Sequence, residues 1–248
     1  MKEKIYTIPV NDAFNNSCEC PLCELEKKTI SDLLSYYMGA SIMEPDVRIN
    51  TNEKGFCREH LAAMYNRQEN RLGLALMLHT NLVETNKKTK KNLKGISKLK
   101  SKFNLFAQDG GHKGKLIAAA KDIEANVKSC ALCERLEYTL DRYIDVIMWQ
   151  FFEDNKFHDK FLKANGFCLQ HLAVLIRGAA KYLSESQSEI FINKLTEIEN
   201  NSLDTLEGEI KWFTQKFDYK NEDAPWGNSK DAVPRTIRKI SGRADLKQ

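Results

Sequence analysis

Eight side chains of types that commonly bind metal ions recur in two copies of one pattern. Each copy has a Cys-x-x-Cys pair and then a Gly-Phe-Cys-x-x-His segment, with 33 residues between the two pairs in the first copy and 34 in the second. Three thiolates and one imidazole make a complete tetrahedral shell for zinc. The predicted ligands are Cys20, Cys23, Cys57 and His60 in the first copy and Cys130, Cys133, Cys168 and His171 in the second.

Four protein ligands per ion predict a structural role for the metal. A catalytic zinc keeps one position open for water or substrate, so two complete shells argue against zinc-dependent hydrolysis. An enzymatic site would need a pocket between the repeats that collects polar residues such as Glu44, Asp46 and Arg48. We therefore expect a non-enzymatic protein that binds two zinc ions.

Two other chemistries use closely spaced cysteines. CPLC at a helix start resembles a thiol-disulfide exchange motif, where the helix dipole lowers a cysteine pKa, and iron-sulfur clusters also bind cysteine thiolates. The second copy has Ala131 in place of the proline, and no βαβ context is recognisable, so both rank below zinc. Cys18, which the second copy lacks, is a candidate redox thiol. It motivates an alternative function as a thiol-based redox or metal-responsive regulator.

The residues around the ligands repeat as well, which indicates an internal duplication. The segment CPLCELEKKTISDLLSYYM from Cys20 matches CALCERLEYTLDRYIDVIM from Cys130, and GFCREHLA from Gly55 matches GFCLQHLA from Gly166. Apolar residues after each CxxC follow the i, i+3, i+4, i+7 spacing of one helix face. Each CxxC is thus predicted to open an amphipathic helix, each glycine to end a helix, and each Cys-x-x-His to start another.

The ligand pairs could close within each copy or be exchanged between copies. Closing the shorter loop costs less entropy, so we expect Cys20 and Cys23 to join Cys57 and His60. The alternative, in which Cys20 and Cys23 meet the second Cys-x-x-His across a pseudo-twofold axis, stays open.

The composition predicts an all-α fold. The 248 residues are 42% hydrophobic, enough for a core, while glycine and proline are sparse. We expect two homologous helical metal-binding modules, a long C-terminal helix from about 186 to 217 that packs across them, and a flexible tail. The predicted boundaries are 1–103 for the first module with a basic helix extension, 104–220 for the second, and 221–248 for the tail.

A net charge of +4 conceals two opposite charge blocks. Residues 87–102 carry eight lysines and no acid, whereas residues 185–209 carry seven acids and one lysine. Such a basic block binds nucleic acid, forms a solvated helix face or is neutralised within the fold. We expect a protein partner, with nucleic acid as a second candidate through a basic patch of Lys87, Lys88, Lys90, Lys91, Lys94, Lys98, Lys100 and Lys102.

The sequence predicts a cytoplasmic protein without a membrane partner. Its first residues lack the apolar stretch of a signal peptide, and no eighteen apolar residues run together. Cysteines clustered in a reducing compartment indicate metal ligands or redox thiols rather than disulfides.

The motifs also carry a resemblance. With IPVNDAF before CPLC, and EPDVR and GFCREH after it, the chain resembles an uncharacterised bacterial family of helical proteins with repeated CPxC…GFCxxH motifs, over roughly residues 5 to 215. The resemblance implies a cytoplasmic metal-binding protein without an established activity. The second copy has no counterpart of EPDVR, so a function tied to that segment would belong to the first module alone.

Overall fold

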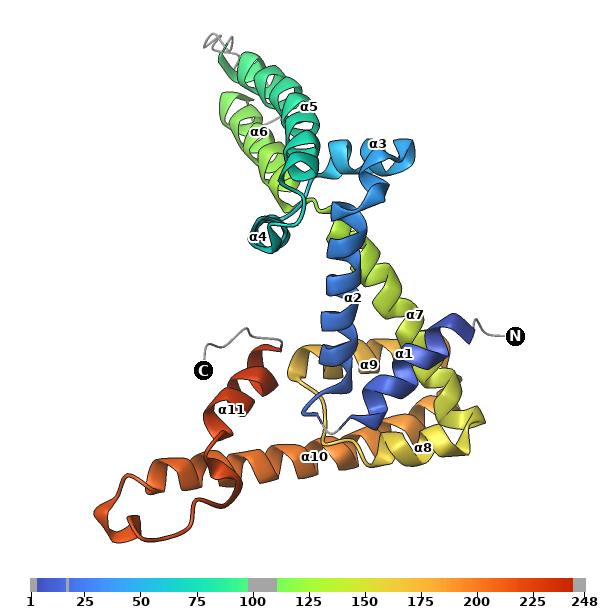
Figure 1. Ribbon diagram of the computed structural model, residues 1–248, viewed down its shortest axis with the longest axis vertical. Helices are drawn as coiled ribbons and strands as arrows, with labels where there is room; N and C mark the ends of the chain where they lie inside the picture. The colour runs from blue at the N-terminus through green and yellow to red at the C-terminus, as the bar shows by residue number, and fades with distance from the viewer. Residues whose placement is uncertain (1–3, 17, 98–110, 243–248) are drawn as a thin grey trace. The chain divides into compact units, whose positions relative to one another are not determined.

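The computed structural model describes residues 4–16, 18–97 and 111–242, and this part of the chain contains helices and no strand (Figure 1). The predicted all-α fold is confirmed. The α-helices are α1 Lys4–Asn15, α2 Pro21–Met38, α3 Pro45–Lys54, α4 Arg58–Arg67, α5 Arg71–Ser97, α6 Gly111–Lys128, α7 Ala131–Glu153, α8 Asn155–Leu162, α9 Leu169–Tyr182, α10 Glu185–Gln215 and α11 Ala232–Ser241. Short 3-10 segments are η1 Ala40–Met43, η2 Tyr219–Asn221 and η3 Gly227–Ser229.

The chain divides into two compact units. Unit 1 comprises residues 1–29 and 138–248, and unit 2 comprises residues 30–137. The division falls within α2 and α7, so each of these helices contributes to both units. The units differ from the two repeats, because unit 1 contains the first CxxC with the second Cys-x-x-His, whereas unit 2 contains the first Cys-x-x-His with the second CxxC.

The core of unit 1 is built around phenylalanine rings from several helices. Phe161 of α8 is fully buried, and its ring centroid lies 5.2 Å from that of Phe151 and 5.3 Å from that of Phe191. Phe14 of α1 stacks on the same ring at 5.7 Å. Aromatic pairs in this distance range stabilise a core beyond the area that they bury. The rings therefore fix α1, α7, α8 and α10 around one centre.

The predicted long helix is present as α10, 31 residues long. Ser184 and Gln187 form a capping box at its start, which satisfies free backbone donors. Phe191, Leu195 and Ile198 of α10 enter a core to which residues before Thr29 also contribute, so the helix buries its apolar face against parts of both repeats.

The prediction of a flexible tail from residue 221 is wrong for the residues described, which extend to 242. Lys216 is buried and donates hydrogen bonds to the carbonyls of Asn221, Glu222 and Ala224 at 2.6 to 2.8 Å. These bonds organise the turn that leads into α11. Helix α11 is hard to predict from the sequence, because charged residues as well as apolar ones attach it to the fold.

Two cations of α11, Lys239 and Arg235, fasten it within unit 1 through ion pairs. Lys239 and Glu199 lie 2.5 Å apart with side chains only 5% exposed each, and the other Glu199 oxygen accepts the Phe167 N–H at 3.0 Å. One guanidinium nitrogen of Arg235 lies 2.5 Å from a carboxylate oxygen of Glu209, and another lies 3.6 Å from a carboxylate oxygen of Glu19. Because Glu19 precedes Cys20 and Phe167 precedes Cys168, α11 is attached beside both of the cysteine segments of this unit.

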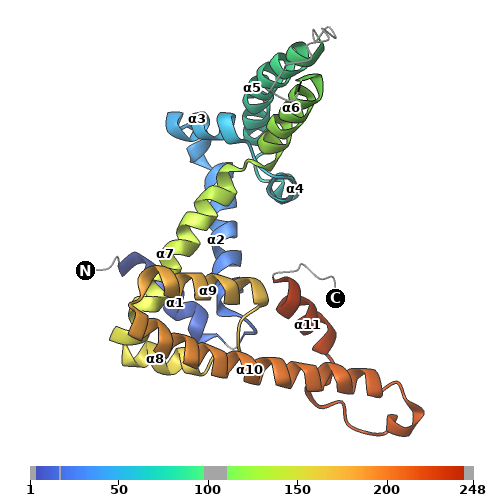
Figure 2. The same cartoon turned by 180° about the vertical axis from the view of Figure 1, so that it is seen from behind.

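Unit 2 contains a helical hairpin and a short helix that packs on it. Figures 1 and 2 both show α5 and α6 side by side, with α3 against α5. The Asn81 side chain of α5 donates to the carbonyl of Asn52 at 3.0 Å, which ties α5 to α3. Gly55 ends α3 with φ 63°, as predicted, and its N–H donates to the Thr51 carbonyl at 2.9 Å.

The second glycine has a different role from the one predicted. Gly166 has φ 113°, but α8 ends at Leu162 and its C-cap is Lys163. A Cβ on Gly166 would lie 2.4 Å from the Ser202 hydroxyl oxygen of α10. Gly166 therefore serves the close approach of a loop to α10 and does not cap a helix.

We expect Lys239→Met to destabilise unit 1 by about 3 to 5 kcal/mol, because it leaves the buried Glu199 carboxylate without its cation. Lys230, which is exposed, supplies the control: Lys230→Met should change the free energy of unfolding by less than about 0.5 kcal/mol. Urea unfolding followed by circular dichroism measures both. Equal effects of the two substitutions would contradict a structural role for the Lys239–Glu199 pair.

Candidate metal centres

The first cluster lies in unit 1 and joins the starts of two helices. Cys20 immediately precedes α2 and Cys23 lies in its first turn, while Cys168 is the N-cap of α9 and His171 lies in its first turn. The His171 Nδ1 atom is 3.6 Å from Cys20 Sγ, 3.3 Å from Cys23 Sγ and 3.1 Å from Cys168 Sγ. The sulfurs of Cys23 and Cys168 are 3.7 Å apart. Four donor atoms thus point at one centre.

The second cluster lies in unit 2 and has the same construction. Cys57 is the N-cap of α4, and Cys130 immediately precedes α7. The His60 Nδ1 atom is 3.1 Å from Cys57 Sγ, 3.5 Å from Cys130 Sγ and 3.4 Å from Cys133 Sγ. The Ala131 N–H donates to the Gly55 carbonyl at 2.9 Å, which connects the two cysteine segments through their backbones.

Both clusters have the dimensions of a tetrahedral zinc shell. Zn–S bonds of about 2.3 Å and Zn–N bonds of about 2.0 to 2.1 Å place the sulfurs about 3.8 Å from each other and about 3.6 Å from the nitrogen. The sulfur–sulfur distances of 3.7 and 3.8 Å and the sulfur–nitrogen distances of 3.1 to 3.6 Å agree with this geometry. All donor atoms of each cluster lie within 4.8 Å of one another, so each cluster could hold a metal ion.

The ligand pairs are exchanged between the repeats, so the within-copy pairing that we expected is wrong. Cys20 and Cys23 join Cys168 and His171, and Cys57 and His60 join the second CxxC. The 18 residues of α2 carry the chain about 27 Å away from its first turn before the next Cys-x-x-His is reached. Closing the longer loop costs only about 1 kcal/mol more, because loop entropy grows slowly with length. The distance that α2 spans therefore outweighs the small entropic advantage of closing the shorter loop.

The thiols of each cluster differ in acidity. Hydrogen bonds with Cys20 and Cys23 hold the pKa of Cys168 far below its usual range, whereas the bond with Cys168 raises the pKa of Cys23. In unit 2 burial opposes ionisation of Cys130, but hydrogen bonds from His60 and the Cys133 backbone lower its pKa to about 6. Each cluster thus favours a thiolate, the form of cysteine that binds metal.

The first cluster has a carboxylate behind its histidine. The Nε2 atom of His171 lies 3.8 Å from a carboxylate oxygen of Glu26 on α2. A carboxylate in this position orients a ligating imidazole and raises its basicity. At the matching position of the second repeat, six residues after the first cysteine, stands the buried Leu136. Glu26 was missed by our sequence analysis, although this comparison of the repeats could have found it.

Cys18, the candidate redox thiol, lies outside both clusters. Its backbone carbonyl accepts a hydrogen bond from the Asn165 side chain at 3.3 Å. Burial, and then the negative charges of Glu24 and Cys20, raise the pKa of the Cys18 thiol to about 11. A thiol that stays protonated at neutral pH is a poor nucleophile and a poor metal ligand.

The polar residues considered for an enzymatic pocket have structural contacts. Arg48 donates hydrogen bonds to the Leu76 carbonyl at 3.2 Å and to the Thr80 hydroxyl at 2.8 Å, which fasten α3 to α5. Glu44 is the N-cap of α3. Asp46 lies in the first turn of α3, where a negative charge stabilises the helix.

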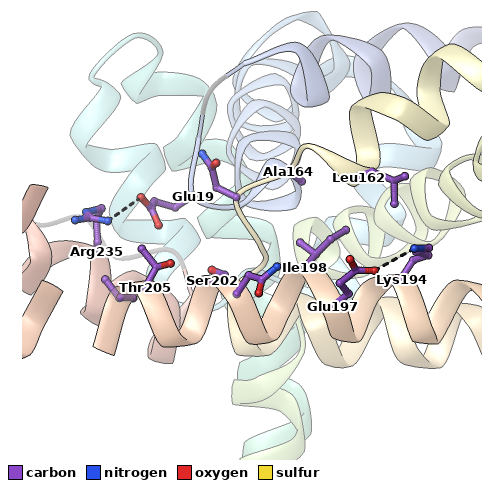
Figure 3. A pocket seen from close by; sticks show the side chains of 12 residues that line it. Glu19, Leu162, Ala164, Lys194, Glu197, Ile198, Ser202, Thr205 and Arg235 are labelled. Atoms are coloured by element: carbon purple, nitrogen blue, oxygen red, sulfur yellow. Dashed lines mark hydrogen bonds and ion pairs between the residues drawn. The ribbon is translucent and has the colours of Figure 1, made fainter. Parts of the chain in front are cut away.

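A polar groove of about 470 Å³ runs along α10 in unit 1 (Figure 3). Its charged side chains are paired, Arg235 with Glu19 at 3.6 Å and Lys194 with Glu197 at 3.0 Å. Of the described residues that line it, none is a cysteine or histidine. The groove therefore offers hydrogen-bonding groups but no nucleophile of these two types and no unpaired carboxylate.

The basic patch is described in part. Lys87, Lys88, Lys90, Lys91 and Lys94 are exposed on α5. Lys98, Lys100 and Lys102 lie outside the described residues.

The fold and the two clusters define an all-α protein with two Cys3His sites that could bind metal. A family model described as a family of unknown function (DUF6062) matches residues 1–247, and the chain belongs to this family. No curated protein and no solved structure matches the chain. Among the described residues, no helix has the length and apolar character needed to cross a membrane.

Pairs of cysteine substitutions test the exchanged pairing. Cys20→Ser and Cys57→Ser should each leave about one metal ion per chain, since each disables one four-ligand shell. The C20S/C168S variant should also keep about one ion, whereas C20S/C57S should keep none. Metal analysis of the purified variants measures this. One retained ion in C20S/C57S together with none in C20S/C168S would restore the within-copy pairing.

Substitution of Glu26 tests the role of its carboxylate. We expect Glu26→Gln to weaken metal binding at the first cluster about tenfold, at the low end of the range for such outer ligands, and to leave the second unchanged. Glu24→Gln removes the same charge from an exposed position two residues away and should change neither affinity by more than about twofold. Competition with a chromophoric chelator in C57S and C20S backgrounds measures each site alone.

Proposed function

We propose that this protein is a non-enzymatic, twin-zinc helical scaffold that presents a surface to a protein or nucleic-acid partner. The observation that carries the proposal is the convergence of four protein donors on each centre. A tetrahedral ion bound by all four has no position for water or substrate, so its role is structural. Three thiolates with one imidazole favour zinc over metals that prefer oxygen ligands.

The ions would join segments that are distant in sequence. In unit 1 the two ligand pairs are separated by 145 to 151 residues, as the contacts of Cys23 with Cys168 and of Cys20 with His171 show. In unit 2 the corresponding separations are 70 to 76 residues. A structural zinc ion contributes on the order of 10 kcal/mol of apparent folding free energy in small modules. Each ion would therefore hold two helix starts together.

The role in presenting a surface to a partner is supported by the exposed residues of the hairpin α5–α6. Large apolar side chains stand in solvent on both helices, among them Leu82 and Val127, which are 61% and 69% exposed. Several exposed apolar side chains on one helical hairpin are typical of an interaction surface. The regulatory alternative depends on a reactive thiol beside the first cluster, and the raised pKa of Cys18 does not favour it.

We expect the purified protein to contain about two zinc ions per chain. A strong chelator should lower the midpoint of thermal unfolding by about 20 °C or more and reduce helicity, because the ions supply folding free energy. Metal analysis and circular dichroism measure these changes. Cys18→Ser should keep both ions and serves as the control. A stably folded protein that contains no metal, and that a chelator does not affect, would refute the proposal.

A further inference from the structure

The lysines of the described basic patch share one side of α5. Lys87, Lys90, Lys91 and Lys94 are three, four and seven residues apart, a spacing that places them on one helix face. The opposite face of α5 meets α6, since Thr85, Thr89 and Asn92 are partly covered there and the Asn126 side chain of α6 reaches the Thr85 hydroxyl at 3.5 Å. Lys87, Lys90 and Lys94 therefore point away from the hairpin seam into solvent, whereas Lys91 lies at the edge of the groove beside α6.

Most of the described lysines of α5 have no acidic partner among the described residues. Lys87 pairs with Glu84 at 2.7 Å, but no ion pair among the described residues involves Lys88, Lys90, Lys91 or Lys94. Three of the seven acids in the acidic block on α10 pair with cations of unit 1: Glu197 with Lys194, Glu199 with Lys239 and Glu209 with Arg235.

A groove of about 550 Å³ between α5 and α6 adds hydrogen-bond donors to the positive charge. Three lysines and two acids line it together with polar side chains that include Thr89 and Asn92; the charged residues are Lys54, Lys88, Lys91, Glu53 and Asp122. Lysine, threonine and asparagine are among the groups that contact phosphate oxygens in protein–nucleic acid complexes. On α6, four further lysines are exposed, against two exposed acids, Asp122 and Glu124: Lys113, Lys115, Lys121 and Lys128.

We propose that the α5–α6 hairpin binds the phosphodiester backbone of double-stranded nucleic acid without reading its sequence. The proposal rests on the scaffold function above and names the class of its partner. Residues 84–97 and 111–128 contain no arginine to read base edges and no Phe, Tyr or Trp to stack on unpaired bases. Residues 84–97 of α5 have only Leu93 and Ile96 as large apolar residues, too few for the wide apolar face of a membrane-binding helix. Because α6 exposes apolar residues such as Ile117 and Val127, vesicle binding is an outcome of the test below.

Binding of short fluorescent DNA and RNA duplexes to the full, metal-loaded chain tests the proposal. Affinity should fall steeply between about 50 and 200 mM salt, because bound phosphates release counterions. The variant K88Q/K90Q/K91Q/K94Q should lose more than about tenfold in affinity and reduce the slope of log K against log salt by about three or more. The DNA and RNA duplexes establish which backbone is preferred.

A matched control keeps the test independent of net charge and of the metal sites. K28Q/K156Q/K211Q/K230Q removes four exposed lysines of unit 1 and should change affinity by less than about twofold. Both variants should keep the metal content and helicity of the unmodified chain, so loss of binding is distinguishable from failure of the scaffold. Equal losses in both variants, no duplex binding at low salt, or binding to phosphatidylserine vesicles in place of duplexes would overturn the proposal.

Discussion

The structure depends on the meeting of two helix starts at each Cys3His cluster. In each cluster one pair of ligands stands where α2 or α7 begins and the other where α9 or α4 begins. A helix start has free backbone N–H groups and a partial positive charge, which favour thiolates. A metal ion that binds these thiolates joins the two starts, and the helices that follow extend from fixed points.

Because the ligand pairs are exchanged, each cluster requires both copies of the pattern. Neither repeat contains a complete cluster, because each supplies a CxxC to one unit and a Cys-x-x-His to the other. The two units then support their clusters differently. Unit 1 surrounds Cys168 with an aromatic core, and its first cluster has Glu26 and the contacts of α11, whereas the second repeat has Leu136 at the position of Glu26. The local pattern was duplicated, but the surroundings have diverged.

The sequence predicts local features well and distant pairings poorly. The starts of α2, α4, α7 and α9, the cap at Gly55 and the extent of α10 follow from residue types within one or two turns. The partner of each ligand pair does not, because loop entropy differs by only about 1 kcal/mol between the two pairings and helix length decides the outcome. Helix α11 was not predicted, because Lys239 and Arg235 attach it to the fold and such residues are usually solvated charges.

Charged side chains are paired differently in the two units. Three of the seven acids in the acidic block of α10 are matched by Lys194, Arg235 and Lys239, so there part of the block serves the fold. In unit 2 the described lysines of α5 are exposed, and four of the five have no acidic partner among the described residues. The chain thus has a concentrated positive surface on α5 although its net charge is only +4. Uncompensated lysines repel one another and do not stabilise the hairpin, so their concentration there is better explained by an anionic partner than by folding.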